Sequence, residues 1–164
     1  MPIGRNPGWV HHHVPLNDRR RSLHPCPMRT HRRRVETPIA IIERVSERLL
    51  EQRFHPVLRF SLAAVEQDRT ARWRLAGREP HALLIVLPAE LPVHPLAMND
   101  DHFRADSEAR MLIALAVVAP TTSQNTATKF YFRYHVQAFE TRVFEQEKDA
   151  RSWLNEILAR GTAR

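Results

Sequence analysis

The sequence predicts an α/β domain, because apolar runs typical of strands alternate with helical patterns along the chain. Residues 81–87 (His-Ala-Leu-Leu-Ile-Val-Leu) and 113–118 (Ile-Ala-Leu-Ala-Val-Val) are almost continuously apolar, which is typical of strands buried on both faces. From residue 113 onwards the order is strand, helix, strand, helix, and this order builds a sheet with helices packed against it. We expect a single mixed sheet of four or five strands and about four helices.

The first part of this domain is predicted to be a strand pair followed by a helix. Residues 38–42 and 48–54 are the two strands, and Pro56 ends the second one because it cannot donate to a strand ladder. The helix spans 61–76, with Ser61 as N-cap and Gly77 as its end. Its expected inward stripe is incomplete and consists of Leu62, Val65, Trp73 and Ala76.

Besides the strand at 113–118, three helices and one further strand are predicted after the apolar run at 81–87. A short helix covers about 105–112, with Ala105, Ala109 and Leu112 facing inward. The helix over about 124–135 has Thr122 or Ser123 as cap, and its predicted inward stripe is Ala127, Phe130, Tyr131 and Tyr134. Residues 139–144 form a strand near a sheet edge, because two charges share one face. The helix over 147–159 has the clearest stripe, which comprises Ala150, Trp153, Leu154 and Ile157.

The net charge of +7 belongs to the N-terminal segment. Residues 1–36 contain eight arginines, one Asp and one Glu, whereas residues 37–164 are nearly neutral at +1. We therefore predict a disordered Arg/His/Pro-rich tail over 1–36 and a folded domain over 37–160. Three interpretations of the tail stay open: a start at Met28 in the natural product, a basic arm that contacts phosphate, or an organelle-targeting segment. The neutral domain gives no reason to expect specific nucleic-acid binding.

The remaining composition favours a cytoplasmic protein. Cys26 is the single cysteine, so no internal disulfide can form, which suits a reducing compartment. No apolar run approaches the roughly 20 residues of a membrane span. No secretory signal pattern is present near the N-terminus.

Several segments resemble the STAS or SpoIIAA-like fold, and more closely a group of small, largely uncharacterised bacterial STAS-like proteins. The resemblance covers about 37–159 and depends on the segments 98–103, 113–119, 129–132, 141–144 and 149–154. It implies a non-catalytic binding or regulatory module without a cofactor, which binds proteins, nucleotides or lipids. Anti-sigma-factor antagonists of this fold carry a phosphorylatable Ser in an Asp-Ser-Ser-Gly turn. The corresponding region here, 88–103, has no such turn, and Ser107 lacks the flanking residues, so that switch is not expected.

The densest polar cluster of the domain is Asp100, Asp101 and His102, with His94 upstream. Carboxylates beside an imidazole can bind a metal or a small ligand, or act as acid and base. The cluster should follow the carboxyl end of a buried strand, where α/β sheets bind ligands. Its spacing matches no metal motif, so a loop with a capping Asp is favoured. A small-ligand or metal-binding protein that uses this loop is the alternative function, and an enzyme is not predicted.

Two further groups, one just before the helix over 124–135 and one within it, are candidate sites. Thr122 and Ser123 precede free amides that could hold an anion, although plain capping is favoured without a glycine-rich loop. Ser123, His102 and Asp100 could form a nucleophile set, but no nucleophile elbow is present. Phe132 lies off the predicted inward stripe and is flanked by Lys129 and Arg133. We therefore predict that Lys129, Phe132 and Arg133 form an exposed surface for a protein partner or a weak homodimer.

Overall fold

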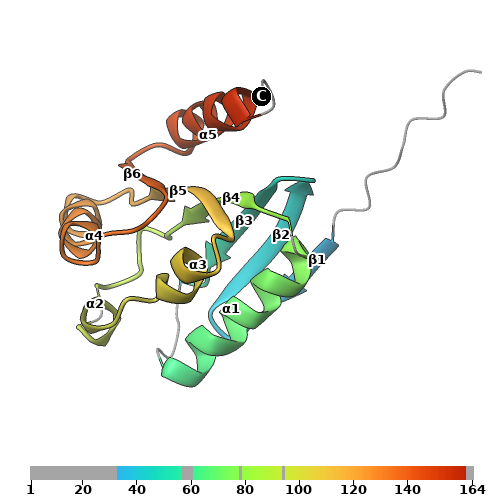
Figure 1. Cartoon of the computed structure of the whole chain (residues 1–164). Helices are drawn as coiled ribbons and strands as arrows, with labels where there is room; N and C mark the ends of the chain where they lie inside the picture. Colours follow the sequence, from blue (N-terminus) through green and yellow to red (C-terminus); the bar gives the residue numbers. More distant parts are fainter. Residues whose placement is uncertain (1–32, 57–60, 78, 94, 162–164) are drawn as a thin grey trace, which may run out of the picture.

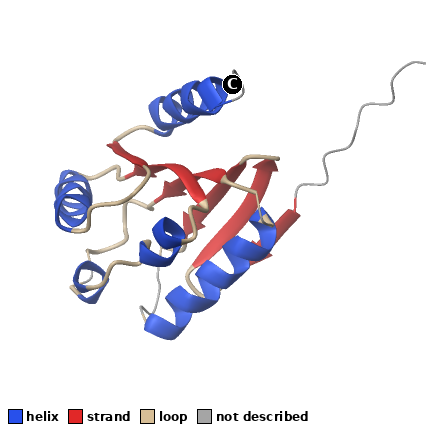
Figure 2. Ribbon diagram, viewed as in Figure 1, coloured by secondary structure: helices blue, strands red, loops and turns tan. Residues whose placement is uncertain are grey.

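The computed structural model describes residues 33–56, 61–77, 79–93 and 95–161, which form an α/β domain around one mixed sheet (Figure 2). The described part of the sheet has six strands in sequential order: β1 (Arg33–Glu36), β2 (Ala40–Ser46), β3 (Leu49–Phe54), β4 (His81–Val86), β5 (Leu112–Val118) and β6 (Glu140–Phe144). The first three strands pair antiparallel, and β3 to β6 pair parallel. The predicted α/β class with one mixed sheet is confirmed, and β6 is an edge strand as expected.

The strand count of four or five is wrong, because β1 lies inside the segment predicted to be disordered. Arg33 to Glu36 pair with Arg44 to Ile41 of β2, and Val35 packs against the core. Thr37 forms the turn between them, since its amide donates to the Ala40 carbonyl at 2.8 Å and its Oγ accepts from the Ala40 amide at 3.0 Å. Because Val35 is the only residue of β1 that packs against the core, the sequence of this strand shows no alternation of apolar and polar residues. The rest of the tail, including Met28, lies outside the described residues.

Helices cover both faces of the sheet (Figure 1). The helical segments are α1 (Leu62–Ala76), α2 (Leu96–Asn99), α3 (Arg104–Glu108), α4 (Thr122–Tyr134) and α5 (Glu147–Gly161). α1, α3 and α4 pack on one face, and α5 packs on the other over β4, β5 and β6. No helix among the described residues combines the length and apolarity that a bilayer crossing requires.

Alternation along the central strands produces two separate cores. Leu83 and Ile85 of β4 face the α1 side, while Ala82 and Leu84 face α5. The α5 side of β5 presents only small or β-branched residues, so the helix can lie close to the sheet. The predicted stripe of α5 is confirmed, because Ala150, Leu154 and Ile157 are buried and Trp153 packs beside them.

The predicted inward stripe of α1 is wrong at Leu62 and confirmed at Ala76, which is 2% exposed. Ser61 does cap the helix, since its Oγ accepts from the Ala64 amide at 3.1 Å. Leu62, however, is 63% exposed. The buried positions of α1 are Ala64, Asp68, Arg72, Leu75 and Ala76. Two charged residues therefore occupy the inward face, and they form part of the site described next.

Candidate ligand-binding cavity

A cavity of about 210 Å³ lies between the sheet and the helices α1, α3 and α4. Its floor comes from the carboxyl-terminal halves of three parallel strands, through Gln52, Ile85 and Val117. Its walls are largely apolar and include Phe54, Leu91, Met98, Phe103 and Phe132. The half-exposed Val93 is at its rim. Ligands of open α/β sheets bind at this end of the strands.

Gln124 ties the segment after β4 to the start of α4. Its Nε2 donates to the carbonyl oxygens of Pro88 and Leu91, both at 2.8 Å. The same residue closes a capping box with Thr121, whose Oγ accepts from the Gln124 amide. The buried Gln124 lines the cavity, so these bonds fix both the helix start and one wall.

Asp68 is the centre of a buried polar group on the sheet side of the cavity. Its two carboxylate oxygens accept from Thr37 Oγ at 2.9 Å and from Gln52 Nε2 at 2.7 Å. Burial raises the pKa of Asp68 above its ordinary value, against the opposing effect of these hydrogen bonds and of Arg72. The Oε1 atom of Gln52 has no hydrogen-bond partner among the described residues.

Arg72 and Asp106 form a buried ion pair that joins α1 to α3. Asp106 is fully buried, and it also accepts from the indole N–H of Trp73 at 2.7 Å. The Arg72 guanidinium lies 5.6 Å from the centre of the Phe103 ring. Its Nε–H lacks a hydrogen-bond partner in the described part of the chain. Arg72 lines the cavity, so an unpaired donor accompanies the unpaired Gln52 acceptor there.

The structure brings one residue of the predicted Asp100-Asp101-His102 site to the cavity. His102 lines it, and its Nε2 lies 3.1 Å from the Ala97 carbonyl oxygen. Burial lowers the pKa of His102, so the ring is neutral at pH 7. The Tyr131 hydroxyl holds the loop, because it accepts from the His102 amide at 2.8 Å and donates to the Asp100 carbonyl at 3.1 Å.

The two carboxylates of that cluster do not line the cavity. Asp101 Oδ1 accepts from the Phe103 amide at 3.1 Å and from Gln137 Nε2 at 3.0 Å, so this carboxylate orders the loop. Asp100 is exposed. No group of three or more His, Cys, Asp or Glu side chains among the described residues could hold a metal ion. His94 lies outside the described residues.

The predicted short helix over 105–112 is also corrected. α3 ends at Glu108, and Arg110 follows with a φ of 52°, which breaks the helix before Leu112 enters β5. The residue that α3 buries is Asp106 instead of an alanine. The sequence did not indicate that Asp106 faces inward, because inward positions of a helix are expected to be apolar and Asp106 is charged.

The predicted positions at the start of α4 shift by one residue. The N-cap is Thr121, and both Thr122 and Ser123 are exposed in the first turn. Ser123 is not a cavity-lining residue, whereas His102 is. The residue of this turn that reaches the cavity is Gln124, which the sequence reasoning did not select.

Of the aromatic residues of α4, Tyr131 is buried as predicted, but the orientations predicted for Phe130, Phe132 and Tyr134 are wrong. Phe132 is half-buried, with its ring 5.9 Å from that of Phe103, and it lines the cavity. Phe130 and Tyr134 are 63% and 75% exposed, and their rings stack at 6.5 Å. The inward face of α4 begins with the polar Gln124 and Asn125, so an apolar period could not locate it. Lys129 and Arg133 are exposed beside the Phe130–Tyr134 pair.

Comparison with known proteins places the chain in a family. Residues 44–158 match the model of a domain of unknown function, DUF7793. The chain belongs to the DUF7793 family. No curated protein and no solved structure matches the chain. The matched range of the DUF7793 domain contains Gln52, Arg72, Asp106 and most of the cavity wall, but not Thr37, which holds Asp68.

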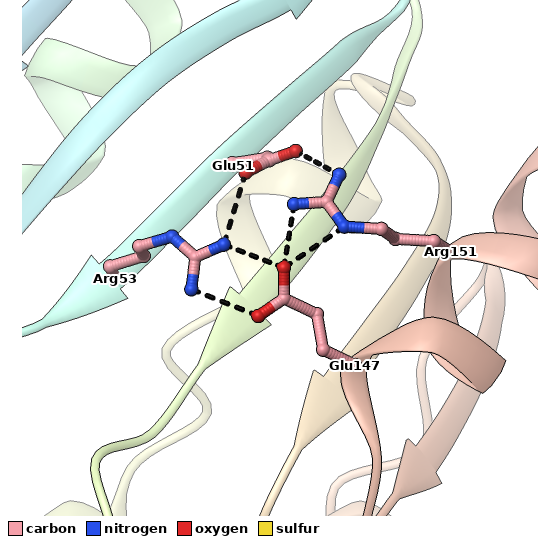
Figure 3. Close-up of polar contacts among 4 residues, drawn as sticks. All are labelled: Glu51, Arg53, Glu147 and Arg151. Carbon is pink, nitrogen blue, oxygen red and sulfur yellow. Dashed lines mark hydrogen bonds and ion pairs between the residues drawn. The ribbon is translucent and has the colours of Figure 1, made fainter.

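A second charged cluster of the DUF7793 domain lies on the opposite face of the sheet (Figure 3). Glu147 of α5 accepts from both Arg53 and Arg151, at 2.6 to 3.0 Å. Arg151 also pairs with Glu51 of β3. Hydrogen bonds from Arg53 hold the pKa of Glu147 at about 2. This carboxylate is therefore ionised at neutral pH and unsuited to donate a proton, and the cluster serves to join α5 to β3.

Proposed function

We propose that this DUF7793 protein is a non-catalytic binding or regulatory module of the STAS-like kind. Its ligand is a small, largely apolar molecule that occupies the cavity under α1 and α4. The supporting observation is the cavity itself, which combines apolar walls with a few buried polar groups at the carboxyl ends of parallel strands. Sites for small molecules in proteins have this composition.

The size of the cavity limits the ligand. An engineered apolar cavity of about 150 Å³ binds benzene, and the cavity here has about 210 Å³. A substituted benzene ring or a short acyl chain therefore fits without rearrangement of the core. A whole nucleotide exceeds this volume, and the largely apolar walls favour an apolar ligand.

The polar groups at the cavity support binding more than catalysis. Asp68 accepts two hydrogen bonds, and Arg72 is paired with Asp106. His102 is close to a backbone carbonyl and stacks on Tyr131, with ring centres 6.1 Å apart. In the described part of the chain the cavity lining includes no Ser, Cys or Lys side chain, and Thr128 contributes its one aliphatic hydroxyl. The alternative of a small-ligand site at the Asp100-Asp101-His102 loop becomes part of this proposal, because His102 supplies one wall.

Thermal unfolding of the full chain with toluene tests the proposal. Toluene should raise the melting temperature as its concentration increases, because a ligand of the native state stabilises by mass action. Ala127→Trp fills the cavity from α4, where Ala127 is half-buried, and should abolish the shift. Ala63→Trp, on the exposed face of α1, is the matched control and should keep it. The absence of any shift with toluene or its substituted derivatives would contradict the proposal.

A weak homodimer through α4 is the second candidate function. Phe130, Tyr134 and Val136 are exposed at the end of this helix, and the domain carries little net charge to oppose self-association. Sedimentation of the full chain should show a dimer at high micromolar concentration. Phe130→Ser combined with Tyr134→Ser should dissociate it, whereas Leu62→Ser, which removes an equally exposed side chain of α1, should not. A monomer at all concentrations overturns the homodimer.

A further inference from the structure

The buried polar group around Asp68 lacks one donor and one acceptor. Gln52 and Arg72 are only 2% and 3% exposed, and both line the cavity. Gln52 Oε1 receives no hydrogen bond, and Arg72 Nε–H donates none, within the described part of the chain. Leaving such groups unpaired in a protein interior costs free energy, so a ligand of the cavity that both side chains line would gain affinity by pairing with them.

The two unpaired atoms belong to side chains that meet at Asp68. The Gln52 amide is oriented by its Nε2, which donates to Asp68 Oδ2 at 2.7 Å, so Oε1 is the remaining acceptor. Arg72 follows Asp68 by one turn on the same face of α1, and its positive charge acts on the Asp68 carboxylate. Both unpaired atoms are covered by neighbouring atoms, so a single ligand group reaches them once the two side chains turn slightly toward the cavity that they line.

The charges at this end of the cavity are already compensated. The Arg72 guanidinium is paired with Asp106, and the Asp68 carboxylate accepts two hydrogen bonds. An anionic ligand would lie beside the Asp68 carboxylate, and a cationic ligand beside the Arg72 guanidinium. Either would also lose its hydration in a largely apolar cavity, which is expensive for a charged group.

We infer that the ligand carries an uncharged group that both accepts and donates a hydrogen bond, a hydroxyl or a carboxamide, at the Gln52–Arg72 end of the cavity. The group accepts from Arg72 Nε–H and donates to Gln52 Oε1. Its apolar body lies against Phe54, Ile85 and Val117. This inference depends on the proposed function, and it adds the chemical class of the ligand.

A matched series of small probes tests the inference with the full chain. Toluene, benzyl alcohol, benzamide, benzoate and benzylammonium share one ring and differ in the polar group. Calorimetric titration at pH 7.5 should show benzyl alcohol and benzamide binding about tenfold more tightly than toluene, as expected for one or two satisfied hydrogen bonds. Benzoate and benzylammonium should bind more weakly than benzyl alcohol.

Variants assign the preference to the two side chains. Gln52→Leu and Arg72→Lys should reduce the preference for benzyl alcohol over toluene to about twofold or less, while Ala63→Trp should retain it. If either variant fails to fold, the probe series with the natural chain decides the question. Equal affinity for toluene and benzyl alcohol overturns the inference and leaves the proposed function intact. Tighter binding of benzoate or benzylammonium also overturns it, and no binding by any probe overturns both.

Discussion

Replacing Asp106 with Ala is expected to lower the free energy of unfolding by about 3–5 kcal/mol, because it leaves a buried charge without a partner. Asp106 is fully buried and pairs with Arg72, whose side chain is 4% exposed. The substitution also removes the acceptor of the Trp73 indole N–H. Urea denaturation followed by circular dichroism would measure the loss, as the change in midpoint at constant slope.

Two further variants separate the ion pair from the helix that carries it. Glu108 also lies on α3, but its pair with Arg104 is exposed, at 65% and 78%. Glu108→Ala should therefore leave the urea midpoint nearly unchanged. The double variant Arg72→Met with Asp106→Leu should recover most of the loss, because an apolar pair avoids the desolvation of two charges. A cost below about 1 kcal/mol for Asp106→Ala would show that the pair is unimportant for stability.

This pair also shows why the cavity could not be predicted from the sequence. Asp68, Arg72 and Asp106 read as solvated charges, since buried charges are rare unless paired. The partner of Arg72 is 34 positions away, and Thr37, which bonds Asp68, is 31 positions away. No local period or spacing indicates such pairs. The apolar stripe expected on α1 therefore left out Asp68 and Arg72 and included the exposed Leu62.

The elements that could be predicted are those whose burial is purely apolar. β4 and β5 have continuous apolar runs, and α5 has an uninterrupted stripe, so all three agree with the sequence. α4 does not, because Gln124 and Asn125 are buried at its start and shift the inward face to Phe132. His102 was selected as a candidate on chemical grounds, and it lines the cavity. Ile85 and Val117 also line the cavity, but they could be assigned to it only once the order of the strands in the sheet was known.

Replacing Leu154 with Ala is expected to cost about 2–5 kcal/mol of stability. Leu154 is fully buried and packs with Ala150 and Ile157 on the α5 side of the sheet. The facing positions of β5 are Ala114 and Ala116, which are too small to fill the space that the substitution leaves. Urea denaturation measures this cost, and a value below about 1 kcal/mol would mean that α5 is held mainly by other contacts.

Trp153 provides the first comparison for this anchoring of α5. Its ring is half-buried, 5.8 Å from the Phe144 ring and 5.8 Å from the Arg142 guanidinium carbon. A fully buried Trp would be expected to cost about 3–5 kcal/mol on replacement by Ala. Because one side of the ring is in water, Trp153→Ala should cost less than Leu154→Ala despite the larger side chain. The opposite order would show that the outer edge of α5 contributes more than its centre.

Glu147→Gln provides the second comparison, because it weakens the ionic contacts of the same helix. The side chains of Arg53 and Arg151 are 45% and 38% exposed, so screening by water keeps the expected cost below about 1 kcal/mol at pH 7. The pKa of Glu147 falls from an ordinary 4.5 to about 2 on folding, so its contribution is complete above about pH 4.5 and is lost as the pH falls towards 2. The difference between Glu147→Gln and the natural chain should therefore shrink from pH 7 to pH 3, whereas the difference caused by Leu154→Ala should not. A pH-independent cost for Glu147→Gln would mean that its packing, and not its charge, holds α5 to β3.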